Sequence, residues 1–214
     1  MQTKGRPLVP PQDVQLLEGD LPADLLAHLL EVPEIALDTE TTGLNPHRDR
    51  LCLVQIAAPD GLVIVLRITG KDAPNLVRLL EAERPLKVIH FARFDVGMLR
   101  HHLGARTNGI YCTKVASKIA RTFTQSHGLK DLVKELAGVT LDKSQQTSYW
   151  GADDLTPAQL AYSANDVRHL LTCKTKLDAI LAREGRTDLA RRCMAHLETQ
   201  VELDLLGYTS IFDH

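Results

Sequence analysis

Short apolar runs dominate the first half of the chain, whereas helically spaced apolar residues dominate the second half. Runs of strand length lie at residues 35–40, 51–57, 62–66, 86–90 and around 110. Helical spacing extends over residues 21–30, 73–82, 92–103, 113–121, 128–138, 157–183 and 188–206. The turn sequence Pro59-Asp60-Gly61 joins two of the strand-length runs. The pattern therefore predicts an α/β fold, with a mixed five-stranded sheet flanked by helices and a helical C-terminal part.

The 214 residues are enough to bury one sizeable core, and neither a repeat nor a low-complexity tract divides them. We therefore predict a single domain over residues 1–214. It has an N-terminal arm and helix over 1–30, a core over 31–185, and a C-terminal helix and tail over 186–214. The apolar residues of the last part indicate either a helix packed on its own domain or a contact between subunits.

Composition narrows the classes of protein that fit. The net charge of −2 argues against binding of long duplexes by bulk electrostatics, although a local basic cleft remains compatible with it. The four cysteines are scattered without a CxxC pair, so we expect reduced, buried thiols and a cytoplasmic location. The longest apolar run, residues 62–66, is too short to cross a membrane, and the N-terminus lacks the apolar segment of a signal peptide.

Two carboxylates follow a buried strand at residues 35–37. Side chains alternate along a strand, so Asp38 and Glu40 are expected on the same side of the sheet. Two like charges so placed need a cation nearby. Solvation of both carboxylates at a frayed strand end is the alternative, and this stretch alone does not decide between the two.

Two further acidic positions occur later in the chain. Asp95 lies in the first turn of the helix expected after the fourth strand, where an acidic residue also complements the helix dipole. Tyr162 and Asp166 are four residues apart on a helix that Thr156 caps and Pro157 opens, so they share one face. Taken alone, the Tyr162 and Asp166 pair also fits a Tyr that packs at the core boundary beside a solvated Asp.

The ordered set of these motifs carries more information than each motif alone. Asp-x-Glu on a strand, Asp after the fourth strand and Tyr-x-x-x-Asp on a late helix resemble the DEDDy branch of the 3′-5′ exonucleases, which includes ribonuclease D. The segments DRLCLVQIA, CTKVASKIART and HGLKDL, together with the short length and the ending IFDH, are most similar to the nanoRNase C group. The resemblance covers about residues 30–185. One departure is Tyr149, where relatives lead us to expect Asp.

The resemblance implies a ribonuclease H-like, DnaQ-type fold and a metal-dependent 3′-5′ exoribonuclease that releases nucleoside 5′-monophosphates from short single-stranded RNA. Hydrolysis would use two divalent cations, Mg²⁺ or Mn²⁺, about 3.5–4 Å apart. By resemblance, Asp38 would bridge both ions, Glu40 and Asp166 would hold the ion that binds the attacking water, and Asp95 would support the other. Tyr162 would orient the water, because a phenol with a pKa of about 10 is a poor base at neutral pH.

Substrate contacts are expected from a different set of residues: Thr39, Leu44, His90, Lys114, Arg121 and Lys130. Leu44 resembles an apolar wedge against the terminal bases, and the basic residues between 114 and 134 could contact a 5′ phosphate; an ordinary loop leucine and a solvated basic face are the alternatives. The resemblance also implies a homo-oligomer, an octameric ring. Other substrates compatible with the motifs are structured RNA ends and DNA 3′ ends, and a non-catalytic nucleic-acid-binding module is the alternative of another class.

Overall fold

The computed structural model describes residues 13–142, 144–152, 154–208 and 211. Its sheet has the strand order β1-β4-β3-β2-β5-β6. The strands are β1 (Val14–Glu18), β2 (Glu34–Thr41), β3 (Leu51–Ala57), β4 (Val63–Arg67), β5 (Leu86–Ile89) and β6 (Ile110–Cys112). Strands β2, β3 and β4 form an antiparallel meander, whereas β1, β5 and β6 each pair in parallel with a neighbour. The predicted mixed α/β sheet is thus confirmed.

The prediction of five strands missed β1. Two other predicted features, one at each end of the chain, lie outside the described residues. Strand β1 is an edge strand that pairs only with β4, and Val14 is its one buried residue. Its apolar pattern is therefore weak, which explains why the strand was not predicted. The arm predicted over residues 1–12 and the end of the IFDH motif fall on residues that the structure does not describe.

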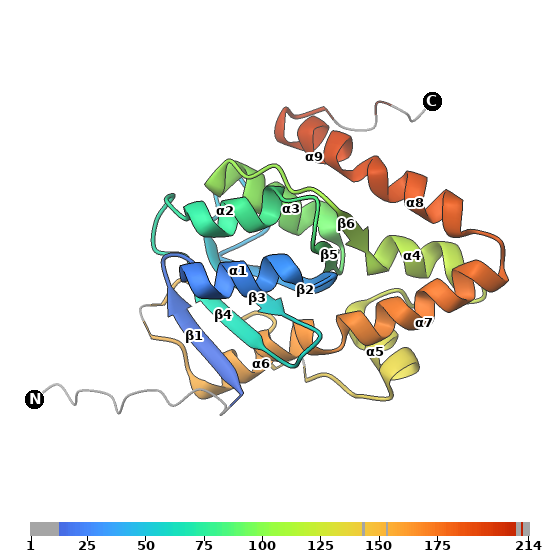
Figure 1. Cartoon of the computed structure of the whole chain (residues 1–214), viewed down its shortest axis with the longest axis horizontal. Coiled ribbons are helices and arrows are strands. Elements are labelled where there is room, and N and C mark those ends of the chain that lie inside the picture. The colour runs from blue at the N-terminus through green and yellow to red at the C-terminus, as the bar shows by residue number, and fades with distance from the viewer. Residues whose placement is uncertain (1–12, 143, 153, 209–210, 212–214) are drawn as a thin grey trace, which may run out of the picture.

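Helices cover both faces of the sheet, with α2 and α3 on one side and α6 and α7 on the other (Figure 1). The helices are α1 (Ala23–Glu31), α2 (Pro74–Glu81), α3 (Ala92–Leu103), α4 (Thr113–Ala120), α5 (Leu129–Ala137), α6 (Pro157–Arg168), α7 (Leu170–Arg183), α8 (Thr187–Ala195) and α9 (Leu197–Leu205). The two longest predicted helices are each divided. Residues 157–183 break at His169, with φ −107° and ψ −3°, and residues 188–206 break at His196.

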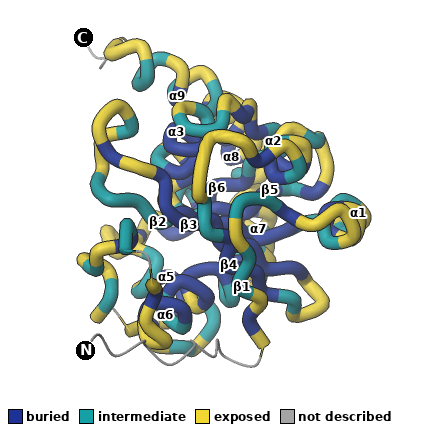
Figure 2. Tube along the Cα trace, turned by 90° about the vertical axis from the view of Figure 1, so that its left-hand side faces the viewer, coloured by how far each residue is buried: buried dark blue, intermediate teal, exposed yellow. Residues whose placement is uncertain are grey.

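The core lies between these helical layers and contains the whole of β3, all of whose residues are buried. Figure 2 shows the buried trace running through β2, β3 and β4. Gln55 on β3 is fully buried, and neither of its amide atoms has a hydrogen-bond partner within the described residues. Gln55 stands opposite Asp38 in the β2–β3 register, so the two side chains project from the same face of the sheet.

The C-terminal helices pack on their own domain, which favours one of the two alternatives left open for this segment. Helix α9 lies along α3, and Arg93 and Arg100 of α3 form ion pairs with Asp204 and Glu198 of α9. Of the four cysteines, three are buried as predicted, but Cys193 on α8 is exposed because it faces away from the core. Among the described residues, none of the helices has the length and apolar character needed to span a membrane.

Candidate active site

The central strand β2 carries the first two carboxylates of the site. Hydrogen-bonded neighbours β3 and β5 flank β2 on both sides, and Asp38 and Glu40 lie near its C-terminal end. Carboxylate oxygens of Asp38, Glu40 and Asp166 lie within 4.8 Å of one another. The alternation along the strand therefore brings Asp38 and Glu40 together as predicted, and helix α6 adds Asp166 from the facing layer.

Asp95 reaches the site from the first turn of α3 and is held by the strand. Its Oδ1 accepts hydrogen bonds from the backbone N of Thr39, at 3.1 Å, and from Thr39 Oγ1, at 2.6 Å. Thr39 was predicted as a substrate contact. Its side chain is buried and its hydroxyl donates to Asp95, so Thr39 orients a carboxylate. Thr39 also lines the cavity described below, and its contact with substrate stays a prediction.

Helix α6 begins at the predicted cap. The Thr156 hydroxyl accepts from the backbone N of Gln159 while the Gln159 side chain accepts from the backbone N of Thr156, which forms a capping box. This start places Tyr162 and Asp166 on the face directed to the sheet, with the Tyr162 hydroxyl beside the Asp166 carboxylate. The ring of Trp150 packs on Tyr162 with a centroid separation of 5.9 Å and fixes the phenol from its other side.

The four carboxyl groups have raised pKa values. Burial is the main cause in each case, and repulsion by the neighbouring carboxylates adds to it for Asp38 and Glu40. The pKa is well above its ordinary value for Asp38, about 9 for Glu40, and about 7 for both Asp95 and Asp166. Within the described residues, none of the four forms an ion pair with Lys or Arg. The cluster is therefore an oxygen-rich site that lacks a compensating protein cation.

Three of these carboxylates, Asp38, Glu40 and Asp166, line a cavity of about 660 Å³. Its walls include the predicted contacts Leu44, His90, Lys114 and Lys130, together with the aromatic residues Phe91 and Trp150. Leu44 projects from the β2–β3 loop (residues 42–50) with 81% of its surface exposed. The loop thus presents an apolar side chain at an acidic cavity, and the role of Leu44 as a wedge stays a prediction.

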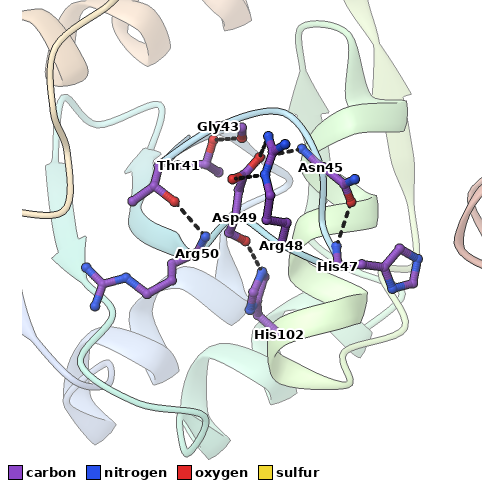
Figure 3. Close-up of polar contacts among 9 residues, drawn as sticks. Thr41, Gly43, Asn45, His47, Arg48, Asp49, Arg50 and His102 are labelled. Atoms are coloured by element: carbon purple, nitrogen blue, oxygen red, sulfur yellow. Dashed lines mark hydrogen bonds and ion pairs between the residues drawn. The ribbon is translucent and has the colours of Figure 1, made fainter.

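A cluster of hydrogen bonds around Asp49 fixes the β2–β3 loop (Figure 3). The Asp49 carboxylate accepts from the backbone N of Asn45, at 2.9 Å, and from the Arg48 guanidinium. His102 of α3 contacts the Asp49 carbonyl oxygen at 2.9 Å. A Cβ at Gly43 would lie 2.6 Å from Asp49 Cγ, so this close approach requires glycine.

Comparison with known proteins identifies the fold and its chemistry. A sequence profile described as 3′-5′ exonuclease matches residues 16–182. The chain belongs to the 3′-5′ exonuclease family. The exonuclease is similar to NrnC of Brucella melitensis, solved with bound Mg²⁺, at 44% identity and a TM-score of 0.88; the match covers 94% of this chain and 98% of that one. The same protein bound to pGG matches at 45% identity, a TM-score of 0.88 and the same coverage.

The exonuclease is also similar to part of curated ribonuclease D proteins. It is 36% identical to ribonuclease D of Gluconacetobacter diazotrophicus over 165 residues, which are 77% of this chain and 42% of the relative. The chain therefore spans less than half the length of the curated ribonuclease D that it matches. Its similarity to NrnC, in contrast, extends over nearly all of both chains.

One residue predicted as a substrate contact of the exonuclease does not line the cavity. Arg121 is fully buried, pairs with Glu135, and donates from Nη1 to Ser117 Oγ and the Ser126 carbonyl oxygen. Its guanidinium holds α4, α5 and the intervening loop together and is not presented to the cavity. His90 lines the cavity as a neutral imidazole, because burial and then Lys114 lower its pKa to about 4.

Three residues at or beside the cavity of the exonuclease were not predicted. Phe91 has a left-handed backbone, with φ 61°, is 47% exposed, and carries the Lys114 ammonium 3.9 Å above its ring. Such a conformation is rare for a bulky residue and cannot be read from sequence alone. Trp150 supports Tyr162, and Gln55 lies beside Asp38. Their roles depend on contacts between distant segments.

Proposed function

We propose that the chain is a metal-dependent 3′-5′ exoribonuclease that hydrolyses short oligoribonucleotides, including dinucleotides, to nucleoside 5′-monophosphates. The observation that carries this proposal is the cluster of Asp38, Glu40 and Asp166 that lines one cavity with Tyr162, with Asp95 held beside it by Thr39, on a chain similar to NrnC over nearly its whole length. Brucella melitensis NrnC has been solved bound to pGG, which supports a short RNA as the substrate here. We include residues 1–214 in one exonuclease domain.

The donor set fits divalent cations. Carboxylate oxygens suit hard ions such as Mg²⁺ and Mn²⁺. Burial first, and repulsion by the neighbouring carboxylates second, raise the pKa values of Asp38 and Glu40, and neither forms an ion pair with Lys or Arg among the described residues. The buried Gln55 amide, on the same face of the sheet as Asp38 and without a hydrogen-bond partner in the described structure, adds two polar atoms behind the carboxylates. Asp38, Glu40, Asp95 and Asp166 would hold two ions. When bound, the two ions supply an activated water and stabilise charge on the phosphoryl and leaving oxygens.

The protein side chains would orient the reacting groups. Burial, and then the charges of Asp166 and Glu40, raise the pKa of Tyr162, so its hydroxyl stays protonated and acts as a hydrogen-bond partner. We infer that it positions the attacking water beside Asp166. Thr39 keeps the Asp95 carboxylate in one orientation through two hydrogen bonds. Leu44, which follows β2, and Phe91, which precedes α3, line the same cavity and offer apolar surfaces to the terminal bases.

Cleavage of a 5′-phosphorylated RNA series tests the proposal. The series runs from a dinucleotide to a long unstructured strand, with Mg²⁺ or Mn²⁺ and with a chelator control. We expect the dinucleotide to be consumed to 5′-monophosphates in a metal-dependent manner, and Asp38→Asn to abolish turnover while the fold is retained. Preference for structured RNA ends with persisting dinucleotides would favour a ribonuclease D-like substrate instead. Absence of metal-dependent cleavage would favour a binding module.

We further propose that the chain acts in the cytoplasm as a homo-oligomer, the octameric ring implied by the resemblance. Four exposed apolar side chains near the C-terminal end of the described chain support an intersubunit contact: Leu189, Leu206, Tyr208 and Ile211. Light scattering across a broad concentration range tests the assembly. A monomer at all concentrations would contradict it.

A further inference from the structure

A second pocket lies behind the β2–β3 loop, outside the carboxylate site. It encloses about 550 Å³ and is lined by residues 46–52, by residues 67–71 after β4, by His101 and His102 of α3, and by residues 150–152. Trp150 lines both this pocket and the catalytic cavity. The β2–β3 loop therefore separates two adjacent hollows, with Leu44 facing the catalytic one and residues 46–50 facing the other.

The second pocket is cationic. Its lining includes four side chains that are positively charged at neutral pH: Arg48, Arg50, Arg67 and Lys71. Arg48 pairs with Asp49 and Arg67 with Glu18, so Arg50 and Lys71 carry the local excess of positive charge. Among the described lining residues, Asp49 is the one acidic side chain, and its carboxylate is already engaged by Arg48 and by the loop backbone. The pKa of His101 is lowered by burial and also by His102, His47 and Lys71, which agrees with a local excess of positive charge.

The Arg50 side chain is directed away from the Asp49 cluster and toward residue 151 (Figure 3). Its Nη2 donates to the Gly151 carbonyl oxygen at 3.3 Å, and Arg50 has no carboxylate partner among the described residues. A Cβ at Gly151 would lie 2.9 Å from Arg50 Nη2 and 2.9 Å from Tyr149 Oη, so both side chains converge over this glycine. Tyr149 is 66% exposed. An exposed aromatic ring thus stands beside an arginine at the edge of the pocket.

We propose that this pocket binds phosphate groups of an RNA strand longer than a dinucleotide while its 3′ end occupies the catalytic cavity. Arg50 and Lys71 would contact the phosphates, since a guanidinium matches the geometry of phosphate oxygens, and Tyr149 would stack on a base. This proposal rests on the proposed function and extends it to substrate length. Tyr149 stands where relatives lead us to expect Asp. An Asp carboxylate at that position would lie near Arg50 and oppose phosphate binding, whereas Tyr149 would not.

Continuity with the catalytic cavity favours a strand over a free nucleotide as the occupant. Leu44 at the loop tip lines the catalytic cavity, and the pocket wall starts two residues later at Pro46. A strand that crosses the loop would therefore meet Leu44 first and the cationic pocket next. We place a dinucleotide in the catalytic cavity alone, so the second pocket would act only on longer chains.

The test measures how the loss of positive charge in the pocket affects RNAs of different length. Binding of 5′-phosphorylated di-, penta- and heptanucleotides is measured by fluorescence anisotropy in chelator, and kcat/KM for the same series is measured with Mg²⁺. The variants are Arg50→Gln and Lys71→Gln, singly and together. The matched control removes two exposed cations elsewhere, Arg84→Gln with Lys176→Gln. Because binding in chelator needs no cleavage, failure of the proposed function and failure of this inference are distinguishable.

We expect the double variant to bind the heptanucleotide about tenfold more weakly, with the dinucleotide unchanged. The salt dependence of log K should fall by about 0.7 for each lost phosphate contact. Tyr149→Asp should weaken the heptanucleotide selectively, and Tyr149→Phe should not. An equal loss of binding affinity for RNAs of all lengths, or no loss of affinity, would overturn the inference. A nucleoside 5′-monophosphate that binds twice to the wild type and once to the double variant, without any length dependence, would also overturn it.

Discussion

Substitution of one carboxylate should make the metal-free protein more stable. Oxygens of Asp38, Glu40 and Asp166 lie within 4.8 Å, and two unit charges at that distance repel by about 3 kcal/mol at an effective dielectric constant near 20. Asp166→Asn removes one charge and keeps an oxygen that can accept from Tyr162. Proton uptake already relieves part of the repulsion in the wild type, so we expect a gain of about 1–3 kcal/mol in unfolding free energy in chelator at about pH 8, or about 2–10 °C in Tm.

The pH dependence of the Tm difference tests whether ionisation of Asp166 is what destabilises the native state. The pKa of Asp166 is raised on folding from 3.8 to about 7, so ionisation destabilises the native state progressively as pH rises between these two values. The difference in Tm between Asp166→Asn and the wild type should be near zero at about pH 4 and full above about pH 7. Mg²⁺ should stabilise the wild type more than the variant, because it binds the native carboxylates.

Thermal unfolding monitored by circular dichroism, with and without chelator, measures these differences. Asp72→Asn is the matched control, since Asp72 is exposed and the same chemical change there should alter Tm little. A variant that melts below the wild type in chelator would refute the reasoning. A difference in Tm that does not change with pH would refute it as well.

Three further substitutions separate chemistry, positioning and stability. Tyr162→Phe should lower the single-turnover rate by about 10–100-fold while calorimetry gives unchanged metal affinity; an unchanged rate would remove the hydroxyl from the reaction. Thr39→Val deletes the 2.6 Å hydrogen bond to Asp95 and should weaken metal binding by about 10-fold, with recovery in Thr39→Ser; equal loss in both variants would contradict an orienting hydroxyl. Arg121→Met should reduce the unfolding free energy by about 3 kcal/mol in denaturant titration, without changing activity per folded molecule; a selective rise in KM would instead restore Arg121 as a substrate contact.

Local patterns predicted most elements of the fold because their signals are contained in short windows. The helix over 92–103 has the predicted bounds, and the buried runs at 51–57 and 86–90 are strands β3 and β5. The edge strand β1 was missed because it buries little of its own surface. The breaks at His169 and His196 were missed because apolar spacing continues through them, and the change of direction is set by the layers on which the helices pack.

The carboxylates of the site were predictable because alternation on β2 and spacing on α6 are local. Their convergence was inferred from their order in the chain, and the structure brings them together. The roles of Thr39 and Arg121 were not predictable in the same way. Each depends on one partner in a different element, Asp95 for Thr39 and Glu135 for Arg121. A charged or hydroxyl side chain gives no sign in sequence of which partner it will find.

The two walls of the metal site differ in how tightly the fold holds them. Strand β2 is bonded along both edges, so amides around Asp38 should exchange with solvent only when the whole protein unfolds. Asp166 comes from α6, which ends at His169 and is preceded, in the described part of residues 142–155, by turns and not by helix or strand. We therefore expect the β2 wall to stay in place and the α6 wall to shift slightly when ions of different radius bind, without disturbing the sheet.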